Sequence, residues 1–387
     1  MTEQAKVPAI RFAGFTDPWE QRKLSEVATF GGGHTPPMAD PDNYEDGYVL
    51  WVTSQDVKSN YLDRTTTQIT EKGAKELTLY PAGSLVMVTR SGILRHTLPV
   101  AELRKPSTVN QDIRVILPQG ECCGEWLLQF FISHNKELLL EFGKTGTTVE
   151  SVDFGKIKDM LLYMPSTVEQ QQIGDFFAKL DSLITLHQRK YDKLVIFKKS
   201  MLEKMFPKDG ESVPEIRFAG FTDPWEQRKF SEIVDVCSGR DYKHLDGGPI
   251  PVYGTGGYMT SVSEALSHNR DAIGIGRKGT IDKPYLLKAP FWTVDTLFYA
   301  IPKSDINLEF ALCSFSNVDW KSKDESTGLP SLSKESINET VLSVPNVVEQ
   351  NHLGSFFADL DRLITLHQRK LELLRNIKKS LLDKMFV

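Results

Sequence analysis

The stretch IRFAGFTDPWEQRK at residues 10–23 occurs a second time, unchanged, at residues 216–229. A second pair follows at a shorter offset: VEQQQIGDFFAKLDSLITLHQRK at 168–190 matches VEQNHLGSFFADLDRLITLHQRK at 348–370, and KKSMLEKMF at 198–206 matches KKSLLDKMF at 378–386. Similarity of this length does not arise by chance, so the chain is a tandem duplication. We call the first pair of segments the leaders and the later segments the helical frames.

The segments between leader and helical frame hardly match. The first insert runs from about residue 24 to 166, and the second from about residue 230 to 346. Unlike inserts within near-identical frames indicate a fixed scaffold that carries two different specificities. The alternative is an old duplication whose inserts drifted neutrally, but drift should also have altered the frames.

Each helical frame begins with a helix signature. Ser166 is a candidate N-cap with Glu169 three residues later, the pattern of a capping box, and Asn346 is the cap in the second copy. A helix of about 38 residues is about 57 Å long, which is too long to bury its apolar stripe on one small domain. We therefore expect the two helices to pair with each other, in antiparallel orientation. The heptad-like seam consists of Ile173, Phe177, Leu180, Ile184, Tyr191, Leu194 and Met201, and of Leu353, Phe357, Leu360, Ile364, Leu371, Leu374 and Leu381.

Two pairs of repeated side chains carry specific expectations. His187 and His367 share one seam position. They form either a polar layer that sets the register or the partly exposed edge of the stripe, and the second is the more common arrangement. Trp19 and Trp225 each follow a Thr-Asp-Pro turn. Because both copies carry the same residue, we expect each Trp to pack its globular segment onto the helices rather than to stack on a base.

The bulk composition is that of an ordinary globular protein. A chain of 387 residues is longer than one core usually supports, and 40% hydrophobic and 25% charged residues are typical values. No membrane-length apolar run and no secretory pattern is visible. The net charge of −5 counts against a nucleic-acid partner without excluding one, because basic residues can gather on one face. A reducing cytoplasm is favoured, because no disulfide or zinc spacing links Cys122, Cys123, Cys237 and Cys313.

Both inserts predict mixed, strand-rich domains. Short β-type runs bounded by Gly, Pro and Asn or Asp lie at 48–53, 84–89 and 113–117, and at 272–275, 290–294 and 297–301. Helices are expected at 125–142 and 308–316. The segments 86–92 and 273–279 resemble each other as a strand running into a basic turn, and a polar turn follows in each insert, at 144–151 and 326–333.

Basic and amide side chains on such turns are candidate DNA contacts. Arg and Lys pair with guanine, and Asn and Gln with adenine, because their donors and acceptors match the major-groove edges. Arg90 and Arg277 are favoured, since the sequence places them at equivalent positions. For any single residue, a solvated surface position is the more common alternative. The candidates are Gln55, Lys58, Arg90, Arg95, Asn110 and Gln111 in the first insert, and Arg240, Lys243, Thr255, Arg277, Lys278 and Thr280 in the second.

Catalytic motifs are not found. Gly143-Lys144-Thr145 resembles the end of a phosphate-binding loop, but Leu138 stands where that loop needs glycine. The segment 274–279 matches the dinucleotide pattern GxGxxG, yet Pro284 and strand-like residues follow where a helix is required. No nucleophile elbow, HExxH helix, adenine-methyltransferase motif or nuclease core is visible. We therefore predict no catalytic residue and no metal ligand.

The leaders, the Pro-x-x-x-Glu-Gln start of each helix at 165–170 and 345–350, and the duplicated insert-plus-helix plan resemble the specificity subunit of type I restriction–modification enzymes. The resemblance covers essentially the whole chain. It implies an α+β fold: two globular mixed α/β target recognition domains separated by two long helices packed as an antiparallel coiled coil, a pseudo-twofold internal repeat. The expected domains are 1–166 with its leader 8–23, the central helix 167–206, 207–346 with its leader 214–229, and the C-terminal helix 347–387.

By the same resemblance, the chain is a non-catalytic, DNA-binding subunit. Each domain would read one half of an asymmetric bipartite double-stranded DNA target, with the helices setting the spacer. Two methyltransferase subunits would bind the chain, and motor–nuclease subunits would join through them. The assembled complex would be a site-specific deoxyribonuclease and adenine methyltransferase, with S-adenosylmethionine, ATP and magnesium held by the partners. The competing class is a coiled-coil scaffold with two ligand- or protein-binding domains, which does not explain near-identical frames around unlike inserts.

Overall fold

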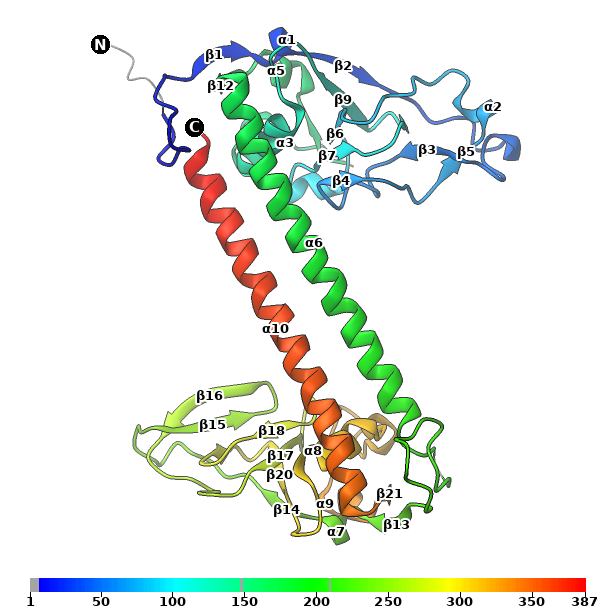
Figure 1. Ribbon diagram of the computed structural model, residues 1–387, viewed down its shortest axis with the longest axis vertical. Helices are drawn as coiled ribbons and strands as arrows, with labels where there is room; N and C mark the ends of the chain where they lie inside the picture. Colours follow the sequence, from blue (N-terminus) through cyan, green and yellow to red (C-terminus); the bar gives the residue numbers. More distant parts are fainter. Residues whose placement is uncertain (1–6, 147–148, 209) are drawn as a thin grey trace. The chain divides into compact units, whose positions relative to one another are not determined.

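The computed structural model describes residues 7–146, 149–208 and 210–387. The chain forms two compact units (Figure 1). The first comprises Met1–Leu186 together with Lys370–Val387, and the second comprises His187–Arg369. Both boundaries fall inside the helical frames, so each long helix contributes one part to each unit.

The helical frames form the helices α6 (Thr167–Lys204) and α10 (Val347–Met385), as expected. Each begins at its predicted cap. The backbone N–H of Glu169 donates to Ser166 Oγ at 3.4 Å, and the equivalent bond to the Asn346 side chain is 3.0 Å long. These caps satisfy N–H groups that have no partner within the helix.

The other half of the predicted capping box is not formed. Instead of turning back to the cap, the buried Glu169 carboxylate accepts two hydrogen bonds from Arg11 of the leader, at 2.8 and 2.7 Å. Arg217 binds Glu349 in the same way, at 2.7 and 2.8 Å. A bidentate guanidinium–carboxylate pair is stronger than a bond to a backbone N–H, which explains the outcome. The acid of each frame therefore fixes the leader to its helix.

The glutamine that follows each acid fixes the helix to its globular domain. Gln170 accepts from the backbone N–H of Cys123 at 2.9 Å, and Gln350 accepts from the backbone N–H of Asn307 at 3.0 Å. Each side-chain amide also donates to the carbonyl of the proline five residues earlier. The Pro-x-x-x-Glu-Gln motif thus has a structural role at every defined position.

Helix segments pair antiparallel within each unit. In the first unit, Phe177 of α6 meets Phe386, which follows α10, at a ring-centroid distance of 6.1 Å, and Asp181 pairs with Lys378 at 2.6 Å. The position on one helix rises as that on the other falls. In the second unit, Lys198 pairs with Asp361 at 2.5 Å. The predicted antiparallel pairing is confirmed within each unit.

The two seam histidines meet in the second unit. His187 Nδ1 lies 2.8 Å from His367 Nδ1, and the ring centroids are 5.0 Å apart. Both side chains are half-buried. Both features that the sequence suggested as alternatives are therefore present. The two histidines form a polar contact, and they lie at the partly exposed edge of the apolar stripe.

The first unit is built around a five-stranded sheet (Figure 1). Its order is β2-β9-β6-β7-β4, and the helix α3 (Gly124–Ser133) packs on it. A smaller sheet, β5-β3-β8, joins β3 and β8 in parallel, and the leader strand β1 pairs antiparallel with β12, which precedes α6. The strands are β1 (Glu20–Lys23), β2 (Ala28–Gly32), β3 (Val49–Val52), β4 (Tyr61–Leu62), β5 (Gln68–Ile69), β6 (Leu85–Val88), β7 (Val100–Leu103), β8 (Thr108–Val109), β9 (Ile113–Pro118), β10 (Gly143–Lys144), β11 (Ser151–Val152) and β12 (Leu161–Met164). The short helices are α1 (Leu24–Val27), η1 (Pro41–Asn43), α2 (Glu71–Ala74), η2 (Gly92–Arg95), α4 (Asn135–Phe142) and α5 (Phe154–Asp159).

The second unit repeats this plan with fewer strands. Its main sheet has the order β14-β20-β17-β18, the small sheet is β16-β15-β19, and α8 (Leu308–Asn317) takes the place of α3. No strand of the described chain corresponds to β4. The strands are β13 (Glu226–Lys229), β14 (Val234–Ser238), β15 (Ile250–Gly254), β16 (Gly257–Val262), β17 (Ala272–Gly276), β18 (Tyr285–Leu287), β19 (Trp292–Thr293), β20 (Leu297–Pro302) and β21 (Val341–Val344). The short helices are α7 (Phe230–Ile233), η3 (Trp320–Lys323) and α9 (Lys334–Glu339).

The end of each helix closes a core. Phe386 stacks on Trp126 of α3 at 6.2 Å, and Phe206, after α6, stacks on Phe310 of α8 at 5.8 Å. The leader tryptophans lie in the same clusters, with Trp19 6% and Trp225 3% exposed. The predicted packing role of both tryptophans is confirmed.

The inserts contain the predicted β-type runs as strands, with ends shifted by a few residues. The predicted helix at 125–142 is in fact two helices, α3 and α4, separated at His134. The His134 side chain folds back onto the end of α3, where its Nδ1 lies 2.8 Å from Ser133 Oγ. Helical periodicity alone does not detect such a break, because apolar side chains of both helices are buried in the same core.

Candidate nucleic-acid interface

Loops from several strands meet at one edge of the first unit. The backbone N–H of Asn110 donates to Val52 O at 3.0 Å, which joins the β8–β9 turn to the end of β3. The N–H of Thr89, after β6, donates to Asp112 O at 2.8 Å. Thr35, after β2, donates its hydroxyl to Gln111 Oε1 at 2.6 Å. The segments that follow β2, β3 and β6 and the β8–β9 turn thus form one surface, which we call the first loop edge.

The sequence candidates of the first insert lie on or beside this edge, and all except Asn110 are exposed. Gln55, Lys58, Arg90 and Gln111 are exposed there. Arg95 is also exposed but is paired with Glu150 at 2.5 Å, and this pairing lowers the pKa of the Glu150 carboxyl. The Arg95 side chain is nonetheless 63% exposed.

Asn110 is a correction. It is 6% exposed, and its side chain accepts from the backbone N–H of Asp112 at 3.1 Å while its amide lies 3.3 Å from the Asp112 carboxylate. An Asx-type bond of this kind holds a turn. Asn110 therefore shapes the first loop edge from inside and does not present its amide to a base.

An equivalent edge occurs in the second unit. The N–H of Val294 donates to Tyr253 O at 3.0 Å, and the N–H of Arg277 donates to Thr296 O at 2.8 Å. The N–H of Arg240, after β14, donates to Thr293 O at 2.9 Å. The first two bonds repeat those of the first unit, and the third joins the segment after β14 to β19 by a different bond. We call this surface the second loop edge.

The second edge gathers the candidates of the second insert. Arg240, Arg277 and Lys278 are exposed at the junctions just described, and Lys243 is exposed on the segment that follows Arg240. Thr255 and Thr280 are half-buried. Within the described part of the chain, none of the four basic side chains forms an ion pair with an acidic side chain, so their charge is available to an anionic partner.

The predicted equivalence of Arg90 and Arg277 is wrong by one residue. Arg90 forms an isolated β-bridge with Ser151, and its counterpart in the second unit is Lys278, which bridges Ser331. The sheet registers agree, because β6 pairs with β9 as β17 pairs with β20 only in this alignment. A shift of one residue turns a side chain to the opposite face of a strand, so Arg90 and Lys278 are the pair that shares a direction.

These bridges also join two features that the sequence showed separately. The basic turn after β6 contacts the polar turn before α5, and the same holds for the turns after β17 and before α9. Part of the first polar turn, at 147–148, lies outside the described residues. The signal that could have linked the turns is their common order in both inserts.

The segment with the dinucleotide pattern GxGxxG has the local structure expected from the residues that follow it. The GxGxxG segment follows β17 and leads to the strand β18 instead of a helix. No group of three or more His, Cys, Asp or Glu side chains in the described residues could hold a metal ion, and none of the described helices could cross a membrane.

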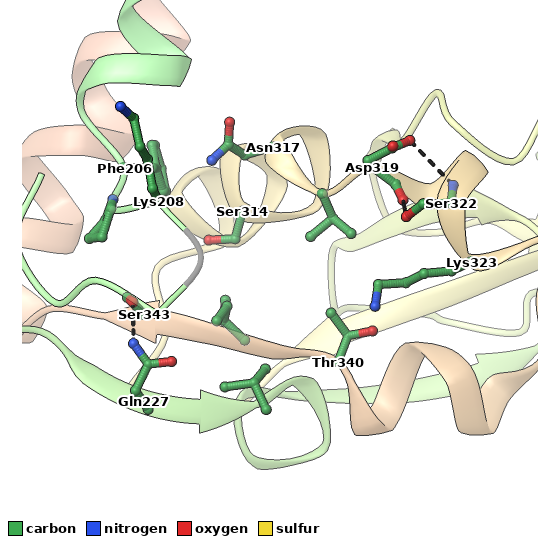
Figure 2. Close-up of a pocket in the computed structure, with 15 residues that line it drawn as sticks. Phe206, Lys208, Gln227, Ser314, Asn317, Asp319, Ser322, Lys323, Thr340 and Ser343 are labelled. Carbon is green, nitrogen blue, oxygen red and sulfur yellow. Dashed lines mark hydrogen bonds between the residues drawn. The ribbon is translucent and has the colours of Figure 1, made fainter.

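A cavity of about 610 Å³ lies in the second unit beside the end of α6 (Figure 2). It lies between the segment after α6, the strand β21 and the turn at η3. Gln227 and Ser343 are bonded to each other at 2.6 Å, and the backbone carbonyl and the carboxylate of Asp319 both accept hydrogen bonds from Ser322. Asp319 is the one carboxylate among the described residues that line the cavity, and it is used to start η3.

Two further hollows repeat each other. One of about 640 Å³ in the first unit and one of about 310 Å³ in the second are lined by matching frame positions. Asp17, Arg22 and Gln170 line the first, and their counterparts in the second leader and helix line the other. The frames therefore present the same surface twice.

Comparison with known proteins gives one family. The family model described as the type I restriction modification DNA specificity domain matches residues 16–195 and 222–376. The specificity subunit of the type I restriction enzyme EcoR124I/EcoR124II from Escherichia coli is 29% identical over 186 residues, covering 45% of this chain and 46% of that protein. The MjaIX specificity subunit of Methanocaldococcus jannaschii is 28% identical over 57% of this chain and 52% of its own length, so the chain spans about half the length of these relatives.

Two other matches extend over nearly the whole chain. The MjaVIII specificity subunit of Methanocaldococcus jannaschii is 21% identical over 94% of this chain and 91% of its own length. The crystal structure of the type I restriction–modification S subunit from M. genitalium matches with a TM-score of 0.68 at 16% identity, covering 99% of both chains, and so shares the fold. With two copies of the family's domain on two units joined by long helices, the chain belongs to the family of type I restriction–modification specificity subunits.

Proposed function

We propose that each globular domain reads one half of an asymmetric bipartite DNA target, that the paired helices set the spacer, and that the chain holds two copies of a methyltransferase subunit. Motor–nuclease subunits join through the methyltransferases, and the assembly acts in the cytoplasm. This chain contributes recognition, while S-adenosylmethionine, ATP and magnesium are bound by the partners.

The observation that carries this proposal is the contrast between frames and loop edges. The frame contacts recur with nearly the same geometry, as in the pairs Arg11–Glu169 and Arg217–Glu349. The two edges share their topology but differ in side chains: Asn110 and Gln111 stand where the second unit has Val294 and Asp295. A scaffold that keeps its contacts and varies its surface loops is suited to reading two different sequences.

Duplicated apolar surface supports two copies of one partner. Leu183 and Leu186 are 47% and 46% exposed in the first unit, and Leu363 and Leu366 are 42% and 45% exposed at the equivalent places of the second. The two matching hollows are a second repeated feature, so each unit offers the same candidate docking surfaces. A partner that recognises one face also recognises the other.

The test is to express the chain with a type I methyltransferase subunit and to map methylated adenines in the host genome. We expect a bipartite motif with unlike halves. Replacing Arg240, Arg277 and Lys278 by Ala should relax or abolish recognition of one half only, and replacing Lys58 and Arg90 by Ala should affect the other. If no bipartite motif is methylated although the complex assembles, the alternative of a scaffold with two ligand- or protein-binding domains is favoured.

The spacer role has its own test. Seven residues inserted at the matching point of both helices, after Gln188 and after Gln368, keep the antiparallel register and lengthen the pair by about 10 Å, or about 3 base pairs. The mapped motif should keep both halves and gain that spacer. An insertion in one helix alone breaks the register and serves as the control. An unchanged spacer in an active double-insertion variant would contradict the proposal that the helices set the spacer length.

A further inference from the structure

The hairpin formed by β15 and β16 has apolar side chains exposed beside its tip. The tip turns at Thr255-Gly256, and Gly257 follows with a φ of +102°, a conformation that suits glycine. Tyr258 is 64% exposed and Met259 is 52% exposed. Single exposed apolar residues are common, so the position of these two decides their meaning.

That position is on the second loop edge. The Tyr285 hydroxyl donates to Gly254 O at 2.7 Å at the start of the tip, and the ring of Tyr258 lies 6.4 Å from that of Tyr253. The carbonyl of Tyr253 is the acceptor in the junction with Val294. The exposed apolar pair is therefore continuous with the surface that carries the unpaired basic side chains of the second unit.

The surroundings favour DNA as the partner that covers the tip. Arg240, Arg277 and Lys278 provide positive charge on the same edge without ion-pair partners in the described residues. A two-stranded ribbon fits the major groove, where apolar side chains contact the thymine methyl group. Basic side chains beside it are placed to bind the flanking phosphates.

We propose that Tyr258 and Met259 form an apolar reading element that enters the major groove of the second half-site. This inference rests on the proposed DNA recognition. It names the uncharged side chains that contact the bases. The basic residues of the edge contribute positive charge, and the hairpin contributes shape and apolar contact. The Tyr258 hydroxyl forms an exposed hydrogen bond with Ser261 Oγ at 3.1 Å, and the backbone pairing of β15 with β16 holds the hairpin.

Among the described residues of the first unit, no hairpin corresponds to β15–β16. After β3 its chain continues through Thr53–Thr67, which includes β4 and turns back toward the helices, before β5 begins. The two half-sites are therefore read by different devices. Loss of the hairpin side chains should affect the second half-site alone.

The experiment measures DNA affinity as a function of salt, with the full chain in complex with its methyltransferase partner and a duplex that carries the mapped target. Tyr258→Ala and Met259→Ala should each weaken specific binding about tenfold with an unchanged slope of log K against log salt, because no counterion-releasing contact is lost. Lys278→Ala should weaken binding and also reduce the slope by about 0.9. Tyr258→Phe keeps the ring and should bind like the wild type.

Tyr48→Ala is the matched control, since Tyr48 is 67% exposed but precedes β3, at the end of that strand remote from the loop edge. Thermal unfolding of each variant shows whether the fold is kept. The inference is overturned if Tyr258→Ala and Met259→Ala bind like the wild type, or if their loss is accompanied by a smaller salt slope. If the wild-type complex shows no selective binding at all, it is the proposed function that fails.

Discussion

The same ion pair exists twice in this chain, in two different environments. Asp181 pairs with Lys378 in the first unit, where both side chains are 9% exposed. Lys198 pairs with Asp361 in the second unit, where they are 26% and 46% exposed. The frame sequences that supply the four residues are nearly identical, so the difference comes from what each insert places over the helices.

In the first unit the insert covers the pair with a polar network. Asn60, beside β4, donates to Asp181 at 2.9 Å, and Gln129 of α3 donates to Asp181 at 3.3 Å. The Tyr61 hydroxyl donates to Glu125 at 2.6 Å, and burial raises the Tyr61 pKa well above its usual range. All of these groups come from the first insert.

In the second unit the described residues supply no such cover. The β4 segment is replaced by the tight β15–β16 hairpin, and Cys313 of α8 stands at the position of Gln129. Burial raises the pKa of Cys313 to about 12, so its thiol stays neutral beside the pair. The insert therefore determines how deeply the repeated ion pair is buried. In the first unit it does so through the segment that contains β4 and packs against the helix.

The largest expected difference between the units comes from removing the lysines. Lys378→Ala leaves the Asp181 carboxylate buried without its cation and should destabilise the first unit by about 3–5 kcal/mol. Lys198→Ala leaves a solvated aspartate and should cost the second unit about 1 kcal/mol or less. Hydrogen exchange measured by mass spectrometry in rising urea reports the two units separately.

The control is the double variant Asp181→Leu with Lys378→Met. Because it removes both charges together, it should recover much of the stability that Lys378→Ala loses. Equal losses for the two lysine variants would contradict the claim that the inserts set the strength of the contact.

The frame pairs with the leader should behave alike in both units. Arg11 and Arg217 are each 11% exposed, and their partners Glu169 and Glu349 are each 1% exposed. Glu169→Gln and Glu349→Gln each remove a charge-assisted bidentate bond and should cost about 2 kcal/mol in their own units. The same urea experiment measures both. A difference of more than about 1 kcal/mol would show that the inserts also act on the leader contacts.

The frames could be predicted from sequence because they repeat and because helices follow local rules. The caps Ser166 and Asn346 and the seam positions were predictable from residue type and spacing. The role of Glu169 was not, since its partner Arg11 lies 158 positions earlier in the chain. A local rule chose the nearer backbone group, and the tertiary contact was the stronger one.

The loop edges show where pattern recognition stops. That basic and amide residues gather on turns was predictable, and the structure brings most of them together. The pairing of Arg90 with Lys278 was not, because the sequence similarity between the strands favours an alignment that the sheet register excludes. The burial of Asn110 also depends on the β8–β9 turn. An asparagine that holds a turn cannot be distinguished by residue type from one that contacts a base.

A smaller difference between the units concerns Glu102 on β7. It is 7% exposed, and burial raises its pKa from 4.5 to about 7, partly opposed by Arg104 at 3.0 Å. The sheet registers place Leu286 at the equivalent position of the second unit. The first unit thus buries an acid where the second has a half-buried leucine.

This acid makes the first unit less stable as pH rises. Between about pH 4.5 and pH 7 the folded state holds the Glu102 proton and the unfolded state does not, so the stability is highest below this window and is lost through it. We expect a loss of about 1–2 kcal/mol between pH 5 and pH 8 from this group. Glu102→Leu should remove that dependence, as urea unfolding at both pH values would show. A Glu102→Leu variant with the wild-type pH dependence would contradict this origin.

The smallest predicted difference concerns the glycine at which each long helix meets its domain. A Cβ on Gly354 of α10 would lie 2.3 Å from Asn307 Oδ1, the atom that caps α8 by accepting from the N–H of Phe310 at 2.9 Å. A Cβ on Gly174 of α6 would lie 3.1 Å from its nearest neighbours, in Glu125 and Trp126.

Both substitutions to Ala gain up to about 1 kcal/mol of helix propensity. Only Gly354→Ala must displace a capping side chain, which costs about 1 kcal/mol more. Gly174→Ala should therefore leave the stability of the first unit nearly unchanged. Gly354→Ala should lower the stability of the second unit by about 1 kcal/mol more than Gly174→Ala lowers that of the first. Asn307→Ser shortens the cap and makes room for the new methyl group, so the pair Gly354→Ala with Asn307→Ser should recover part of the loss. If it does not, the close approach of α10 to α8 is limited by the backbone and not by the cap.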